Sequence, residues 1–238
     1  MITIELNNFM GSAYCCSQLY SSKEGFLPIT YKFSHGNIYG LVSDFGCGSW
    51  ALSTSLGGRC EEVLQGSVCV NGHKSSCDEL KNYSCFIGEG NIWGINTEND
   101  SVTVKECIQR ALEISGLPFT AAQIKSLFGL SDERYNRSLE YVSGEIYKIS
   151  IAVGFALDKK VFCYPWMNTH DVSRYIDISD IMLLKKYDKI VLIPTCRASL
   201  KTPICKSFDY TVNFHSYEKK YFCLNSAERK RLKSIKGW

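Results

Sequence analysis

The pattern of hydrophobic and polar positions divides the chain into three regions. In the first 90 residues, short apolar segments alternate with polar positions or end at glycines, as β-strands and their turns do. Residues 2–6 alternate apolar and polar side chains and predict an edge strand. Further strands are expected at 26–33, 37–42, 66–72 and 83–87.

The middle region has helical spacing instead. Thr103 with Glu106, and Thr120 with Gln123, have the spacing of capping boxes, in which two side chains satisfy the first backbone N–H groups of a helix. Helices are expected at 107–114, 124–128, 132–141 and 143–157. Apolar residues recur at helical spacing along the last of these, which indicates a buried face.

The last region returns to strands. Residues 161–164 and 189–193 are short, fully apolar runs, as buried parallel strands require. A helix is expected between them, and two short strands near the end. They cover 173–186, 208–214 and 220–223. This order predicts an α/β fold: a mainly parallel sheet, an antiparallel β subdomain at the N-terminus, and a helical insertion at about 95–145.

Composition, charge and cysteine spacing indicate which classes of protein and partner to expect. The chain is 45% hydrophobic and 21% charged, an ordinary globular balance, and its net charge of +3 gives no reason to expect a nucleic-acid partner. The 12 cysteines have no C-x-x-C spacing, so we expect reduced cysteines that pack as small hydrophobes. We find neither the pattern of a signal peptide nor an apolar run that spans a bilayer, and we therefore expect a cytoplasmic protein.

Residues 43–50, Ser-Asp-Phe-Gly-Cys-Gly-Ser-Trp, lie between a predicted strand and a run that can begin a helix. That is the context of a phosphate-binding loop, Gly-x4-Gly-Lys-Ser/Thr. Ser43 stands at the first glycine position, and Gly48 stands at the second. Ser49 replaces the lysine that reaches the phosphates, and Trp50 replaces the hydroxyl that binds Mg²⁺.

The loop therefore keeps a nucleotide-binding shape without the reactive side chains. A seryl hydroxyl cannot replace a cation, and an indole has no oxygen to offer a metal. The candidate nucleotide-binding residues are Phe45, Gly46, Cys47, Gly48, Ser49, Trp50 and Ala51. Trp50 either closes the phosphate pocket or fills core volume, and both alternatives predict weak or no phosphate binding.

Six segments, in this order, resemble the ATPase subunit of an ABC transporter, and they cover nearly the whole chain. They are the strand and loop of 37–48, Gly-x-Val-x-Val-x-Gly at 66–72, the helical-domain entry at 101–106, a signature at 142–145, the helix and strand of 148–161, and the strand ending before Cys196. The resemblance implies a P-loop NTPase, with a RecA-like core. The whole chain would be one ABC-ATPase-like domain, with a core of 1–90 and 150–225 and a basic tail at 226–238.

The departures from the family pattern matter as much as the matches. The degenerate Walker B positions are Tyr164, Pro165 and Trp166, and the degenerate signature is Val142, Ser143, Gly144 and Glu145. Cys196 stands where the family has its switch histidine, and Glu145 would face a γ-phosphate unfavourably. Losing one such charged group typically costs a factor of ~10² to 10³, so we expect no catalytic residues, no metal and little or no hydrolysis.

The resemblance implies a function and partners. The chain would be a degenerate nucleotide-binding subunit at the inner face of the cell membrane, coupling a partner ATPase subunit to a membrane permease as a homo- or hetero-dimer. The expected permease-docking residues are Gly88, Glu89 and Trp93, and weakly bound ATP without Mg²⁺ is the one cofactor left open. The alternative is a nucleotide-independent scaffold or regulatory protein on the same fold.

Two further alternatives stay open at this stage. His170 and Asp171 are either a catalytic pair or part of a subunit-interface loop. Tyr14 and Tyr20 lie where the family stacks an aromatic ring on adenine, although surface tyrosines are an equal alternative. An active NTPase with a new site is disfavoured because no carboxylate-rich cluster replaces the missing acids.

Overall fold

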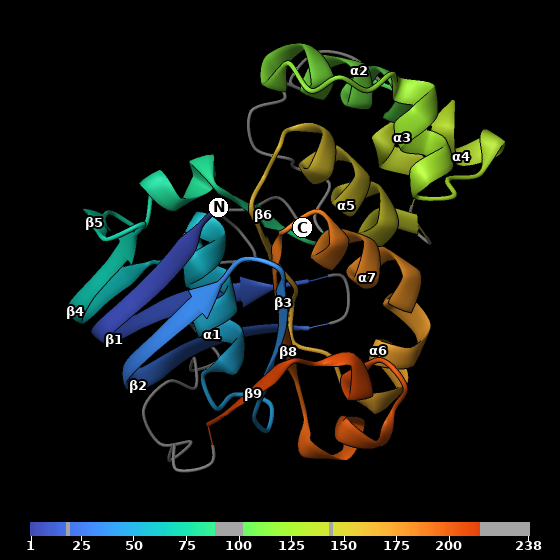
Figure 1. The fold of residues 1–238 in the computed structure, drawn as a ribbon. Coiled ribbons are helices and arrows are strands. Elements are labelled where there is room, and N and C mark those ends of the chain that lie inside the picture. Colours follow the sequence, from blue (N-terminus) through green and yellow to red (C-terminus); the bar gives the residue numbers. More distant parts are fainter. Residues whose placement is uncertain (18–19, 89–101, 143–144, 215–238) are drawn as a thin grey trace.

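The computed structural model describes residues 1–17, 20–88, 102–142 and 145–214. Two β-sheets lie on either side of helix α1 (Ser49–Thr54), and helices α5 (Ile146–Ala156) and α7 (Ile178–Lys186) pack against the far face of the second sheet (Figure 1). The first sheet has the order β2-β1-β4-β5, and its strands are β1 (Thr3–Cys16), β2 (Ser21–Ser34), β4 (Glu62–Val70) and β5 (His73–Ser75). Its strands are antiparallel throughout.

The second sheet confirms the predicted parallel core. It has the order β6-β7-β8-β3-β9, and every neighbouring pair is parallel. Its strands are β3 (Asn37–Val42), β6 (Ser84–Phe86), β7 (Val161–Cys163), β8 (Ile190–Thr195) and β9 (Tyr210–Asn213). Strands β7 and β8 are buried at every position, as expected for apolar runs that are covered on both faces.

The prediction of an edge strand at 2–6 is wrong. Strand β1 continues to Cys16 and lies between β2 and β4. Its register shifts between Leu6 and Phe9, where Asn8 has a φ of 50°, and such a bulge interrupts the alternation on which the prediction rested. Gly66 lies inside β4 rather than at its end. The position requires glycine because its φ is 74° and an added Cβ would come 2.2 Å from the Asn8 carbonyl oxygen.

The helical region follows its local signals closely. Its helices are α2 (Val104–Ser115), α3 (Ala121–Leu127), α4 (Asp132–Tyr135) and α5 (Ile146–Ala156). Both predicted capping boxes are present, one at Thr103 and one at Thr120. The predicted helix at 132–141 is broken after Tyr135 and is followed only by a short 3-10 helix at Leu139–Tyr141, because Arg137 and Leu139 form backbone hydrogen bonds with the segment 102–104.

The single helix predicted at 173–186 is two helices, α6 (Thr169–Tyr175) and α7 (Ile178–Lys186). Buried Ile176 takes an extended conformation between them, and the Asp177 side chain caps α7 by accepting a hydrogen bond from the Ser179 N–H at 2.9 Å. The strand predicted at 220–223 and the basic tail lie outside the described residues.

The core consists of two hydrophobic clusters. One includes side chains from α2, α3, α5 and α7 and from one face of the parallel sheet. The other joins the antiparallel sheet to α1 (Ser49–Thr54) and to the opposite face of the parallel sheet. Helix α1 thus lies between the two sheets, directly after the loop that follows β3 (Figure 1). Within the described part of the chain, no helix is long and apolar enough to cross a membrane.

Candidate functional site

The glycine loop, residues 43–48, connects β3 to α1 and has the backbone of an anion-binding turn. Gly46 and Gly48 have positive φ values of 82° and 95°, which turn their N–H groups toward one side. The Ser43 N–H donates to the Thr195 carbonyl at 3.0 Å and so fixes the loop to the end of β8. Ser43 Oγ and Ser49 Oγ are 2.5 Å apart inside the loop. The backbone shape predicted from the sequence is therefore present.

The carboxylate of Glu24, on β2, occupies this loop. The Gly46 N–H donates to Glu24 Oε1 at 3.1 Å, and the Gly48 N–H donates to Glu24 Oε2 at 3.2 Å. A third hydrogen bond comes from the backbone of Ala51 in the first turn of α1. Glu24 is only 1% exposed. Both carboxylate oxygens thus take the donors that a phosphate-binding loop offers to its ligand.

Burial decides the protonation of this carboxyl. Removal from water raises the pKa of Glu24 to about 7, although hydrogen bonds from Gly48, Gly46 and Ala51 act to lower it. The carboxyl therefore changes charge near neutral pH. Sequence reasoning missed Glu24 as a site residue, since it lies 22 positions before Gly46 in the chain.

An aromatic cluster of Tyr20, Phe45, Trp50 and Trp166 fills the space beside the loop. Trp50 is fully buried, and its ring centroid lies 6.0 Å from that of Phe45. Phe45 in turn meets Trp166 at 5.2 Å and Tyr20 at 5.6 Å. The Trp166 indole N–H donates to the Ser43 carbonyl at 3.2 Å. Trp50 and Trp166, at two positions that the sequence resemblance assigned to the nucleotide site, are thus packed aromatic rings.

The segment after β7 is held firmly but carries no carboxylate. The Tyr164 N–H donates to the Leu192 carbonyl at 2.9 Å, and Ser53 Oγ donates to the Tyr164 carbonyl at 2.7 Å. Tyr164 belongs to the helical-side core cluster and Trp166 to the cluster around α1, so Pro165 spans the boundary between them. The segment 164–166 therefore lies beside the glycine loop, and its Tyr164 and Trp166 side chains pack in the core.

Cys196, the predicted switch position, lies just after β8. Its sulfur is 3.2 Å from Ser199 Oγ and 3.6 Å from Thr169 Oγ1. Burial acts to raise the pKa of Cys196, but hydrogen bonds, with Ser199 first, leave that pKa below its ordinary value. Cys196 forms no disulfide bond within the described residues.

The neighbouring pair His170 and Asp171 lies at the start of α6. Asp171 accepts a hydrogen bond from the Tyr20 hydroxyl at 3.0 Å, and Asn168 Nδ2 donates to the same hydroxyl at 2.7 Å. His170 is exposed, and its backbone N–H donates to the Asn168 cap at 2.8 Å. Among the contacts of the described residues, none joins the two side chains of the supposed catalytic pair. Asp171 instead positions Tyr20 against the aromatic cluster.

Three of the other predicted site residues, Val142, Glu145 and Gly88, lie beside the helices of the insertion and α5. Val142 is buried there and accepts a hydrogen bond from the Glu145 N–H at 2.8 Å, while Ser131 Oγ donates to Glu145 Oε1 at 3.3 Å. The Gly88 N–H donates to Ser150 Oγ at 3.3 Å. The remaining signature and docking positions, Ser143, Gly144, Glu89 and Trp93, lie outside the described residues.

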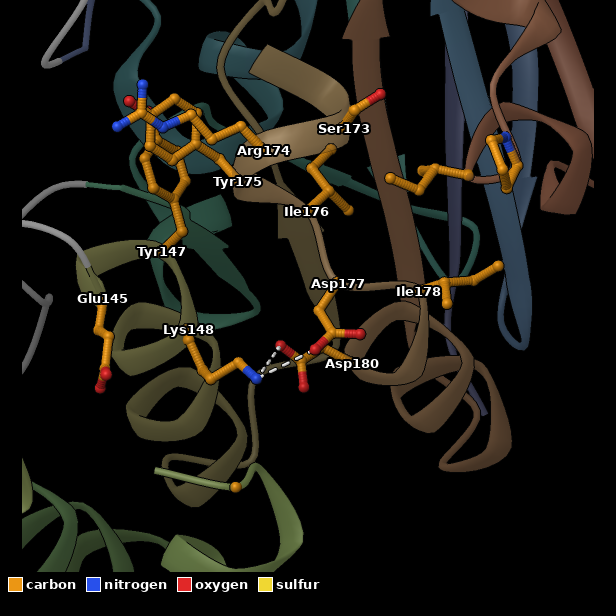
Figure 2. Close-up of a pocket in the computed structure, with 13 residues that line it drawn as sticks. Glu145, Tyr147, Lys148, Ser173, Arg174, Tyr175, Ile176, Asp177, Ile178 and Asp180 are labelled. Atoms are coloured by element: carbon orange, nitrogen blue, oxygen red, sulfur yellow. Dashed lines mark hydrogen bonds and ion pairs between the residues drawn. The ribbon is translucent and has the colours of Figure 1, made fainter. Parts of the chain in front are cut away.

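A pocket of about 610 Å³ lies apart from the loop, between α5 and the junction of α6 and α7 (Figure 2). Lys148 reaches across it to Asp177 at 3.1 Å and Asp180 at 3.7 Å. Burial raises the pKa of Asp180 to about 6. Tyr147 and Tyr175 stack at a centroid distance of 5.1 Å along its upper part. The sequence showed no sign of this pocket, because its lining residues come from separate segments.

The residues at the loop do not suit the Mg²⁺ that the resemblance implies. By the sequence resemblance, Trp50 takes the position of the metal-binding hydroxyl, and Pro165 and Trp166 take those of the acids, and none of these side chains offers an oxygen ligand. In the described residues, no group of three or more His, Cys, Asp or Glu side chains is placed to hold a metal ion.

Comparison with known proteins identifies the fold. No protein-family model and no curated protein sequence matches the chain. A solved structure described as an ABC transporter ATP-binding protein from Pyrococcus furiosus is similar to it with a TM-score of 0.58 and 16% identity, over 91% of this chain and 99% of that one. An ATP-binding subunit of an ABC transporter gives 0.58 and 15%, over 99% and 95%.

The chain has the fold of ABC transporter ATP-binding proteins. A bacterial Atm1-family ABC exporter solved with ATP bound is also similar, with a TM-score of 0.57 and 10% identity, over 99% of this chain and 40% of that one. At these identities the likeness concerns the fold. The activity has to be argued from the residues at the loop.

Proposed function

We propose that the chain is a degenerate nucleotide-binding subunit of an ABC-type transporter. It would couple a partner ATPase subunit to a membrane permease at the inner face of the cell membrane, with weak or no ATP hydrolysis of its own. The fold supports this proposal, since the similar structures are described as ATP-binding proteins of such transporters. The side chains at the loop support the loss of hydrolysis.

The observation that carries the proposal is the aromatic cluster at the reactive end of the loop. Phosphoryl transfer depends on positioned cations and on a group that orients the nucleophile. Here Trp50 and Trp166 are buried and packed through Phe45, so neither position offers a charge or an oxygen ligand. Such a subunit would transmit the conformational change of a partner ATPase subunit to the permease without hydrolysing ATP itself.

The partner surfaces follow the family's geometry. A second ATPase subunit would face the glycine loop, and a permease would dock near Gly88, Glu89 and Trp93. Glu145 would disfavour a γ-phosphate held by the partner's loop, because like charges repel. Turnover by the assembly would therefore depend on the catalytic residues of the partner subunit.

Steady-state phosphate release from Mg²⁺-ATP tests the loss of hydrolysis. We expect the purified chain to release phosphate at the rate of buffer alone, and a Ser49→Ala variant to behave identically because Ser49 has no catalytic role. Phosphate release well above background that Gly48→Asp abolishes would contradict the proposal. Cross-linking of the tagged chain in its native membranes tests the partners. The products expected are a polytopic membrane protein and a second ATP-binding subunit.

The Glu24 contact favours the second candidate function, a scaffold or regulator that uses no nucleotide. In that case the loop N–H groups serve only to hold β2 against α1. Calorimetry with ATP at millimolar concentration separates the two functions. Saturable binding, even without Mg²⁺, supports the transporter subunit, whereas no binding by the isolated chain and by its complexes supports the scaffold.

A further inference from the structure

Glu24 is a buried acid that the transporter-subunit function proposed above does not use. It lies on β2 opposite Ala13 of β1, and its side chain points to the inner face of the sheet, where α1 begins. The neighbouring Lys23 pairs with Glu61 at 3.3 Å instead. Among the described contacts of Glu24, backbone N–H groups alone meet its carboxylate. Carboxylates are rarely buried without a cationic partner, so this arrangement calls for a specific explanation.

The contact has the geometry of a bound anion. Two carboxylate oxygens bond to two different loop amides, at 3.1 and 3.2 Å, and a third amide comes from the first turn of α1. Successive backbone N–H groups in a glycine-rich turn form a concavity that binds phosphate or carboxylate oxygens alike. The same three donors cannot serve Glu24 and a phosphate at the same time.

The backbone around Glu24 is held in place by its neighbours, so β2 cannot move away from the loop and take the carboxylate with it. Residues 21–26 of β2 pair continuously with β1. The backbone of Gly25 also lies against Gly48, where an added Cβ would come 2.6 Å from the Gly25 carbonyl oxygen. A phosphate group could enter only if the Glu24 side chain turned out of the loop.

We propose that Glu24 is a built-in occupant of the glycine loop, an internal carboxylate that excludes phosphate groups from it. The Glu24 carboxylate then blocks the loop N–H groups from phosphate, in addition to the absence of a lysine from the loop. The inference concerns this one contact and holds whether or not the chain pairs with a permease. Its ligand class is the phosphate oxyanion, which Glu24 mimics.

Calorimetric titration with inorganic pyrophosphate tests the inference. The variants are Glu24→Ala, which empties the loop, and Glu24→Gln, which keeps the shape and removes the charge. Glu61→Gln is the matched control, because it removes one negative charge from an exposed carboxylate near the same sheet. We expect Glu24→Ala to bind pyrophosphate at least about tenfold more tightly than the wild type, Glu24→Gln to lie between them, and Glu61→Gln to match the wild type.

Equal affinity of the wild type and of both folded Glu24 variants would overturn the inference, and so would an equal gain in Glu61→Gln. If neither Glu24 variant folds, amide hydrogen exchange of the wild-type chain decides. Slow exchange at Gly46 and Gly48 is expected for amides bonded to a buried carboxylate, whereas exchange at the rate of an open loop contradicts the contact. None of these results depends on the hydrolysis and cross-linking experiments, so the two proposals can fail separately.

Discussion

Helices α1 and α2 both begin with backbone N–H groups that have no partner within the helix, and the chain satisfies them in two different ways. At α2 the partner is local: Thr103 accepts from the Glu106 N–H at 3.2 Å, and Glu106 accepts from the Thr103 N–H at 2.8 Å. At α1 the cap residue Gly48 has no side chain, and the partner is Glu24 from a distant strand.

The two glutamates make similar hydrogen bonds but have opposite pKa shifts. Glu106 is exposed, and hydrogen bonds from Thr103, the backbone first, lower its pKa. Glu24 is buried, and loss of water raises its pKa to about 7 despite three hydrogen bonds. The comparison shows that burial, rather than the number of N–H donors, sets the sign of the shift here.

The largest expected effect concerns the aromatic packing beside Glu24, the distant residue that caps α1. Trp50→Ala removes a fully buried indole from the cluster around α1 and should cost about 3–5 kcal/mol of unfolding free energy. Urea denaturation measures this loss. Phe45→Ala, at a ring that is 38% exposed, is the control and should cost clearly less. Equal losses in the two variants would mean that the cluster does not support the loop as described.

The next effect is a pH dependence. Because the pKa of Glu24 is raised from 4.5 to about 7 in the folded chain, the folded state holds a proton that the unfolded state releases between these values. The contribution of this proton to the free energy of unfolding, roughly 3 kcal/mol, is fully present below pH 4.5 and is lost as the pH rises through about 7. Glu24→Gln should remove this slope from urea denaturation free energies measured across that range. Parallel profiles for wild type, Glu24→Gln and Glu61→Gln would refute the assignment.

The smallest effect concerns the local cap. Thr103→Ala removes one side of the α2 capping box and should cost about 1 kcal/mol. Thr120→Ala, in the equivalent box of α3, should cost a similar amount. Thermal or urea unfolding of both variants measures the effect. A loss as large as that of Trp50→Ala would show that the α2 cap also depends on tertiary contacts, and the contrast between the two helices would fail.

Some of the structure follows from the sequence alone, because the deciding contacts are close in the chain. The capping boxes of α2 and α3 join residues three apart, and both formed as expected. The strand at 37–42 is apolar enough to be buried on both faces in any α/β sheet, and it became β3 at those residues. The backbone shape of the glycine loop likewise depends on its own glycines.

Other features were decided by the tertiary structure. The second half of β1, the break at Ile176 and the end of α4 at Tyr135 each depend on pairing or burial against distant segments. The sequence did contain one signal for Glu24, since it shares a strand face with Phe26, which is apolar. That spacing places the acid on the inner face, but only the packing of β2 against α1 brings its carboxylate to Gly46 and Gly48. A side chain's partner across the fold is set by how the sheets and helices assemble, and no local pattern encodes it.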